Sequence, residues 1–156
     1  MRLVLVALAL AQTLLPKPST LQQITVEPST SAATVAKGGV VTLWADVTLK
    51  PKIHVYATDK QGFTPISLAV TPQPRISVGK VNYPPAETGL TPGIDMLVPI
   101  PMYTKPFRLA APITIGSSAK AGEALTITGT VTYQACNETL CFPAASLPLT
   151  WVVTLK

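Results

Sequence analysis

The stretch EALTITGTVTYQACNETLCFPAASLPLTWVVTL, residues 123–155, alternates apolar and polar residues on both sides of the chain's only two cysteines. The apolar positions on one side of an extended chain are Leu125, Ile127, Val131 and Tyr133 in 123–135, and Leu147, Leu149, Trp151, Val153 and Leu155 in 146–155. A period of two is typical of a strand that buries one face. The stretch therefore predicts two half-buried strands, with Cys136 and Cys141 in the connection between them.

Outward from this stretch, the chain continues as short apolar runs separated by turn residues. Further strands are predicted over 22–28, 40–49, 53–57, 66–71, 75–81 and 107–116. In 40–49 the residues Val41, Leu43, Ala45, Val47 and Leu49 share one face. A turn is predicted over 35–39, and a long ordered loop over 82–101, which is rich in proline and glycine and lacks periodicity. No segment has helical periodicity, so we expect an all-β fold, an antiparallel β-sandwich of immunoglobulin-like architecture.

Composition limits the classes of function. The 156 residues suffice for one domain with a sizeable core, and 47% of them are hydrophobic. Twelve Lys and Arg against seven Asp and Glu give a net charge of +5, but the cations are scattered as single residues. They form no basic patch interleaved with aromatic residues, so no nucleic-acid partner is expected. We expect a monomer.

The N-terminal stretch MRLVLVALALAQTLLP, residues 1–16, resembles an export signal. One arginine precedes an apolar stretch, and Ala9-Leu10-Ala11 follows the small-x-small pattern of a cleavage site. Gln12 and Pro16 leave too few consecutive apolar residues to span a bilayer, and no cysteine follows that could carry a lipid anchor. We therefore expect a signal peptide over 1–16, a single domain over 17–156, and a periplasmic or otherwise extracytoplasmic location.

Most catalytic and metal-binding chemistries lack the residues they need. The single histidine, His54, leaves the chain short of a closed zinc site or a blue-copper site. Serine–histidine–acid catalysis would have to use His54, and no nucleophile-elbow motif is present. His54 is thus expected to be a satisfied or surface histidine, and neither a metal nor a cofactor is expected. Cys136 and Cys141 remain as candidates for chemistry.

The spacing of the two cysteines leaves their role open. A disulfide between them would close a very small loop, which constrains the unfolded chain less than a long loop does. Exported domains nevertheless often carry one structural disulfide. A structural bridge and a redox couple are therefore equally compatible with the spacing alone.

The hairpin sequence itself carries a resemblance. TVTYQACNETLCFPAASLPL, residues 130–149, resembles the active-site hairpin of the N-terminal periplasmic domain of the thiol:disulfide interchange protein DsbD family. In that family a Thr-Tyr-Gln-x-Cys segment leads to a second cysteine followed by an aromatic or aliphatic residue and proline. KIHVYATDKQGFTPISLAV, residues 52–70, is similar to an earlier strand of the family, whose aromatic residues pack beside the cysteines.

The resemblance implies a redox-active cysteine hairpin on an immunoglobulin-like domain, with thiol–disulfide oxidoreductase activity. Cys136 and Cys141 would form a reversible disulfide, with Cys141 as the attacking thiol and Cys136 as its resolving partner. Such a domain takes electrons from a thioredoxin-like domain supplied by a membrane electron-transfer protein. It passes them to periplasmic oxidoreductases that isomerise disulfides or mature cytochromes. No lysine or arginine lies in the hairpin, so its sequence gives no reason to expect a strongly acidified thiol.

Supporting residues follow from the same resemblance. Family members shield the cysteines with a cap loop, which would fall in 91–103, where the candidates are Asp95, Met96 and Tyr103. Tyr103 could equally be a core aromatic residue. Tyr56, Tyr133 and Phe142 are candidate supports beside the cysteines, although each could equally serve packing alone.

Two alternatives stay open. The sequence ends at Lys156 without a membrane segment or a thioredoxin-like Cys-x-x-Cys module, which predicts a stand-alone relative or one separated from its membrane partner. The rival function is a non-enzymatic binding module, an adhesion or chaperone-like sandwich with an inert disulfide and an exposed edge strand for partner pairing.

Overall fold

The computed structural model describes residues 22–58, 62–89 and 99–156. The predicted signal peptide and the cap candidates Asp95 and Met96 lie outside these residues. The described residues form strands and no α-helix. The strands are β1 (Ile24–Thr30), β2 (Thr34–Val35), β3 (Val40–Leu49), β4 (His54–Tyr56), β5 (Ser67–Val70), β6 (Ile76–Val78), β7 (Glu87–Gly89), β8 (Ile100–Tyr103), β9 (Phe107–Ile115), β10 (Ala124–Tyr133), β11 (Ala135–Cys136) and β12 (Ala145–Leu155).

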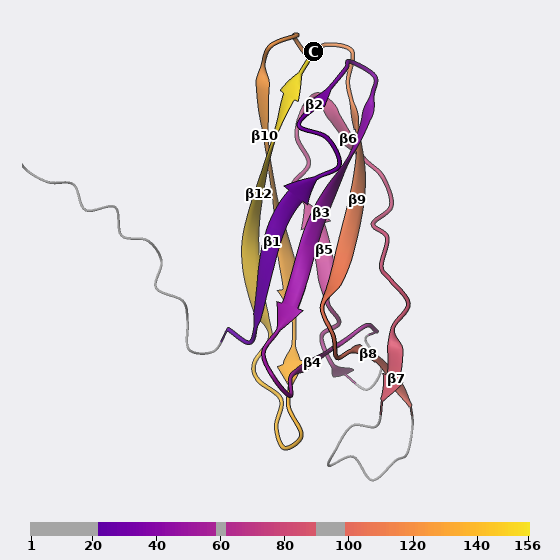
Figure 1. The fold of residues 1–156 in the computed structure, drawn as a ribbon, viewed down its shortest axis with the longest axis vertical. Coiled ribbons are helices and arrows are strands. Elements are labelled where there is room, and N and C mark those ends of the chain that lie inside the picture. Colours follow the sequence, from indigo (N-terminus) through magenta and orange to yellow (C-terminus); the bar gives the residue numbers. More distant parts are fainter. Residues whose placement is uncertain (1–21, 59–61, 90–98) are drawn as a thin grey trace, which may run out of the picture.

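Two four-stranded sheets form the sandwich (Figure 1). One has the strand order β1-β3-β9-β6 and the other β2-β12-β10-β5. Every pairing in them is antiparallel except the two-residue pairing of β2 with β12, which is parallel. The predicted all-β, sandwich-like fold is confirmed.

The alternating residues of the long strands make the core between the sheets. In β3, Val41, Leu43, Ala45 and Val47 are all buried, as the alternation predicts, and Leu49 is partly buried. The apolar faces predicted for 123–135 and 146–155 are buried too, except that Leu147 is only partly so. The hydrophobic effect over these facing positions thus holds the two sheets together.

A third sheet, with the order β11-β4-β8-β7, carries the cysteines. Figure 1 shows β4, β8 and β7 gathered at the end of the sandwich away from the C-terminus. The predicted strand over 123–135 divides there: β10 belongs to the sandwich, whereas β11 pairs with β4 of the third sheet. Gln134 lies at the break between the two strands.

The expectation of a long loop over 82–101 is wrong at both of its ends. Residues 87–89 form β7, which pairs with β8, and β8 begins at Ile100 inside the expected loop. Asn82 makes an isolated bridge to Ala110 of β9. Strands of three or four residues are too short to show a period of two. The regular pairing was therefore invisible in the pattern of apolar residues.

Candidate redox site

The two faces of the third sheet have different surroundings. Val55, Tyr103 and Ala135 point to one side and belong to the main core. On the other side Tyr56, Ile100, Met102 and Cys136 form a small buried cluster, with Phe63 packed against it. The strand period of two separates these groups, since Val55 lies between His54 and Tyr56 on β4. Cys136 is thereby placed on the face turned away from the main core.

Cys136 and Cys141 form a disulfide, with their Cα atoms 4.0 Å apart. The disulfide that the resemblance implies is therefore present. The two residues face each other in an antiparallel bridge. Backbone hydrogen bonds flank them, from Phe142 N to Ala135 O at 2.8 Å and from Asn137 N to Leu140 O at 2.9 Å. The disulfide therefore joins a pair that is not itself hydrogen-bonded, the position where facing residues of a hairpin approach most closely.

The two sulfur-bearing residues differ in exposure. Cys136 is 1% exposed, whereas Cys141 lies on the exposed return strand of the hairpin. The difference arises because Cys136 is held within the third sheet by β4, while Cys141 lies on the outer strand. Cys141 is therefore the more accessible residue of the pair.

Asn137 shapes the four-residue turn between the cysteines. Its Oδ1 atom accepts hydrogen bonds from Thr139 N at 2.9 Å, from Thr139 Oγ1 at 3.0 Å and from Leu140 N at 2.9 Å. Asparagine favours turns because its side chain can bond the backbone just ahead of it. These bonds do not involve the disulfide, so they can hold the turn when the cysteines are reduced.

Gln134 ties the hairpin to a neighbouring segment. Its backbone N–H donates to Thr64 O at 3.2 Å, and its Oε1 accepts from Thr64 N at 3.0 Å. Its Nε2 donates to Phe142 O at 3.2 Å, on the return strand. Gln134 therefore fixes both arms of the hairpin where the chain passes from the sandwich to the third sheet.

The expected supporting aromatic residues separate into two groups. Tyr56 is fully buried in the cluster that contains Cys136, and its ring stacks on Phe63 with centroids 4.1 Å apart. Phe142 follows Cys141 directly and is partly buried against the main core. Tyr133 and Tyr103 both belong to the main core and not to the cysteine cluster. Tyr103 also stacks on Phe107 at 4.0 Å and donates its hydroxyl to Pro84 O.

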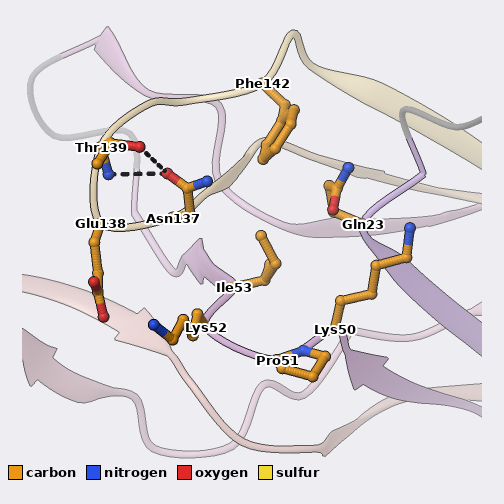
Figure 2. A pocket seen from close by; sticks show the side chains of 9 residues that line it. All are labelled: Gln23, Lys50, Pro51, Lys52, Ile53, Asn137, Glu138, Thr139 and Phe142. Atoms are coloured by element: carbon orange, nitrogen blue, oxygen red, sulfur yellow. Dashed lines mark hydrogen bonds between the residues drawn. The ribbon is translucent and has the colours of Figure 1, made fainter.

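A cavity of about 400 Å³ adjoins the hairpin. It lies between the turn that joins β3 to β4 and residues 137–142 (Figure 2). Figure 2 shows the Phe142 ring pointing toward Ile53, with Lys50 and Lys52 beside Ile53 and Glu138 on the hairpin side. Lys52 has a φ of 64°, a left-handed conformation that non-glycine residues rarely adopt. The hairpin thus has a partly apolar hollow with charged residues beside it.

His54 is the titratable side chain closest to Cys136 in the strand register. It lies directly across from Cys136 in the pairing of β4 with β11. It is 9% exposed, and its Nε2 lies 3.4 Å from the Tyr56 hydroxyl. Burial lowers the pKa of His54 from its ordinary value of 6.5, because desolvation disfavours the charged ring. The expectation of a satisfied histidine agrees with this hydrogen bond, but the position beside Cys136 could not be inferred from the sequence.

Sequence reasoning therefore missed three residues around the disulfide. Gln134 lies inside the Thr-Tyr-Gln-x-Cys segment, which was a signal that it has a specific role. Asn137 is a turn former directly after the first cysteine, and this also could have been noticed. For His54 only the register of two distant strands carries the information. In the described part of the chain, no three His, Cys, Asp or Glu residues are grouped as metal ligands.

Two solved structures are similar to this chain. The N-terminal periplasmic domain of ScsB from Proteus mirabilis has a similar fold, with a TM-score of 0.58 at 16% sequence identity. That similarity covers 87% of this chain and 48% of the ScsB chain, so this chain spans about half of that structure. The reduced N-terminal domain of DsbD from Neisseria meningitidis has a TM-score of 0.48 at 13% identity, covering 83% of this chain and 85% of that one.

No curated protein matches the sequence. In the described residues, no helix is long and apolar enough to cross a membrane. The family model for the N-terminal domain of the thiol:disulfide interchange protein DsbD matches residues 21–148, which is most of the chain and includes both cysteines. A family of this kind is consistent with thiol–disulfide exchange. This chain belongs to the family of DsbD N-terminal domains.

Proposed function

We propose that the domain is a thiol–disulfide oxidoreductase that carries electrons between proteins through the Cys136–Cys141 disulfide. The observation that carries the proposal is the disulfide between one exposed and one buried cysteine at the end of the sandwich. Thiol–disulfide exchange requires a thiolate to reach one sulfur of a disulfide in line with the other. Because Cys141 is exposed and Cys136 is buried, only Cys141 meets this requirement. A structural disulfide would not need an exposed cysteine.

The reaction runs through a mixed disulfide. A thiolate of a reduced partner attacks Cys141 Sγ, the bond to Cys136 Sγ breaks, and Cys136 leaves with the electron pair and takes up a proton. The partner's second thiolate then attacks the partner's first sulfur, which is bonded to Cys141 in the mixed disulfide, and releases Cys141 as a thiolate. The partner is oxidised by two electrons, and the domain is reduced by two. The same steps in reverse reduce a second partner's disulfide.

The partners in this proposal are thioredoxin-like proteins. One is a reductant linked to a membrane electron-transfer protein, and the others are periplasmic oxidoreductases, including those that serve cytochrome maturation. The turn of the hairpin contains Glu138 and no cation that would stabilise a thiolate. This supports a role for the partner protein in activating the cysteine thiol. An export signal over 1–16 belongs to the same proposal, since oxidising compartments outside the cytoplasm are where a disulfide forms and persists.

A cap over the cysteines is also part of the proposal. The strands that flank residues 90–98, β7 and β8, lie in the same sheet as Cys136. A cap formed by this segment, with Asp95 and Met96, would thus have both of its ends in the sheet that carries Cys136. It would limit access to Cys141 for small oxidants while a specific partner displaces it.

The test is a redox titration against a thiol–disulfide buffer. We expect the Cys136–Cys141 bond to be reduced at potentials typical of carriers, roughly −120 to −270 mV. We also expect the reduced domain to reduce the disulfide of a thioredoxin-like protein at stoichiometric amounts. A bond reduced only below about −300 mV, and inert toward that protein, would instead indicate a structural disulfide and the binding-module function.

A further inference from the structure

Three residues lie in a row across the strands at the site. His54 on β4 pairs with Cys136 on β11, and Cys136 pairs in turn with Cys141 on the return strand of the hairpin. Directly opposed residues of an antiparallel pair project to the same face, with Cβ atoms about 4.5–5.5 Å apart. His54, Cys136 and Cys141 therefore share one face, with the buried cysteine in the middle.

The geometry points to His54 as the general base that removes the proton of Cys136 when this thiol resolves a mixed disulfide on Cys141. This inference rests on the proposed function, in which Cys141 is the sulfur joined to the partner. Cys136 is then a buried thiol that must lose its proton before it can attack. An isolated thiolate is costly to form in a buried site, so a proton acceptor beside it lowers the barrier.

Tyr56 gives the imidazole a defined orientation. Its ring meets that of His54 edge-on at 5.4 Å, and its hydroxyl lies 3.4 Å from Nε2. When Nε2–H donates to the Tyr56 oxygen, Nδ1 carries the free lone pair that accepts the proton. Burial lowers the pKa of His54, so the ring is neutral and ready to accept at neutral pH.

A second cavity gives the proton a route to solvent. It has a volume of about 340 Å³, and its walls include His54, Met102 and Gly89. The same cavity is also lined by Lys52 from the preceding turn, Glu138 from the hairpin and Thr104 after β8. Lys52 and Glu138 carry opposite charges and are the ionisable side chains on these walls besides His54.

The balanced step is as follows. Cys136 Sγ–H gives its proton to His54, and the resulting thiolate attacks Cys141 Sγ. The bond between Cys141 and the partner's sulfur breaks, and that sulfur leaves as a thiolate with the electron pair. The Cys136–Cys141 bond is restored, and the His54 proton passes to water in the cavity. The two cysteines together lose two electrons, which the partner's disulfide has gained.

The experiment uses the reduced full chain and the aryl disulfide dithiobisnitrobenzoate in a stopped-flow spectrometer. Attack by Cys141 releases one coloured thiolate, and resolution by Cys136 releases a second, so the two steps are separate phases. For the wild type we expect a second phase that rises with pH to a midpoint below 6.5 and is constant above it. In His54→Gln we expect that phase to be at least about tenfold slower at pH 7 and to rise toward the thiol pKa of about 8.5. The first phase should be unchanged.

Thr104→Ala is the matched control, because Thr104 lines the same cavity but does not titrate. It should leave both phases unchanged. A second phase with the same rate and pH dependence in His54→Gln as in the wild type would overturn the inference and leave the proposed function standing. Absence of the first phase in the wild type would overturn the proposed function, and the inference with it. Should His54→Gln fail to fold, the pH dependence of the second-phase rate in the wild type decides. A midpoint near 8.5 in that dependence excludes His54 as the base.

Discussion

Trp151 donates its indole N–H to the backbone carbonyl of Trp44 at 2.8 Å, and this bond joins β12 of one sheet to β3 of the other. Trp151 is 2% exposed. Trp151→Phe would leave the Trp44 carbonyl without this donor and would also leave a gap in the core. We expect the free energy of unfolding to fall by about 2 kcal/mol, measured by urea denaturation.

Trp44→Phe is the control for this change, because it keeps the backbone carbonyl that accepts the bond. It alters only the ring that lies 4.2 Å from the Arg108 guanidinium. A smaller loss, about 0.5–1 kcal/mol, is expected. Equal losses in the two variants would show that the bond between the sheets contributes nothing specific.

The difference in exposure between the cysteines predicts different trapping by single variants. Cys136→Ser retains the exposed thiol and should accumulate a mixed disulfide with an oxidised thioredoxin-like domain on a non-reducing gel. Cys141→Ser retains only the buried thiol and should trap at least about tenfold less. Both variants should remain folded, because a disulfide that closes so small a loop contributes only about 2 kcal/mol and the sandwich core holds the fold. Equal trapping would contradict the assignment of Cys141 as the attacking residue.

The Asn137 turn predicts a change in redox potential. Asn137→Ala removes three hydrogen bonds to Oδ1, so the reduced hairpin should fray and hold its thiols apart. We expect the disulfide to become about 1 kcal/mol less stable relative to the two thiols. This corresponds to a reduction potential about 20 mV less negative. Asn137→Asp keeps an oxygen at the same place and should restore most of the wild-type value. A potential that is the same in all three proteins would show that the turn does not preorganise the cysteines.

Acid should weaken the ion pair between Asp46 and Arg108. Hydrogen bonds from Arg108 Nε and Nη2 lower the pKa of Asp46 from its ordinary value of 3.8. A carboxyl whose pKa is lower in the folded protein contributes stability above the unfolded pKa, and this contribution is lost as pH falls through the folded pKa. Asp46→Asn should therefore cost a little stability at pH 7, as expected for an exposed pair, and less at pH 2. The urea midpoints of the wild type and of Asp46→Asn at the two pH values measure this loss of stability. An equal difference between the two proteins at both pH values would show that the ion pair does not cause it.

The long strands were predictable because each buries one face over nine or more residues. The predicted range 40–49 coincides with β3, and 107–116 extends only one residue beyond β9. Of the third sheet, β4 was predicted within the range 53–57, whereas β7, β8 and the separate strand β11 were not, since they contain only two to four residues. Its pairings join segments such as 54–56 and 135–136, and their register depends on the packing of the whole domain.

The candidate site likewise contains residues that a local motif identifies and residues that only the pairing of distant strands brings together. The cysteine pair was found because its residues are close in sequence and belong to a distinctive motif. The position of His54 opposite Cys136 depends on a pairing across about 80 residues, which no local pattern encodes. Tyr56 and Tyr103 were both candidates, and only the alternation of faces across β4 and β8 separates the one beside Cys136 from the one in the main core.

The hairpin disulfide and the sheet that holds it differ in how far apart along the chain their parts lie. The disulfide joins residues five positions apart, whereas the third sheet assembles segments that extend from His54 to Cys136. Closing a short loop costs little entropy, and distant pairings form slowly. An unfolded chain can thus close the Cys136–Cys141 bond before the sheet exists, and among its own cysteines it has no wrong partner to choose. Recovery of the bond during refolding therefore reports oxidation alone, and the folded state must be followed by a probe of the sheet itself.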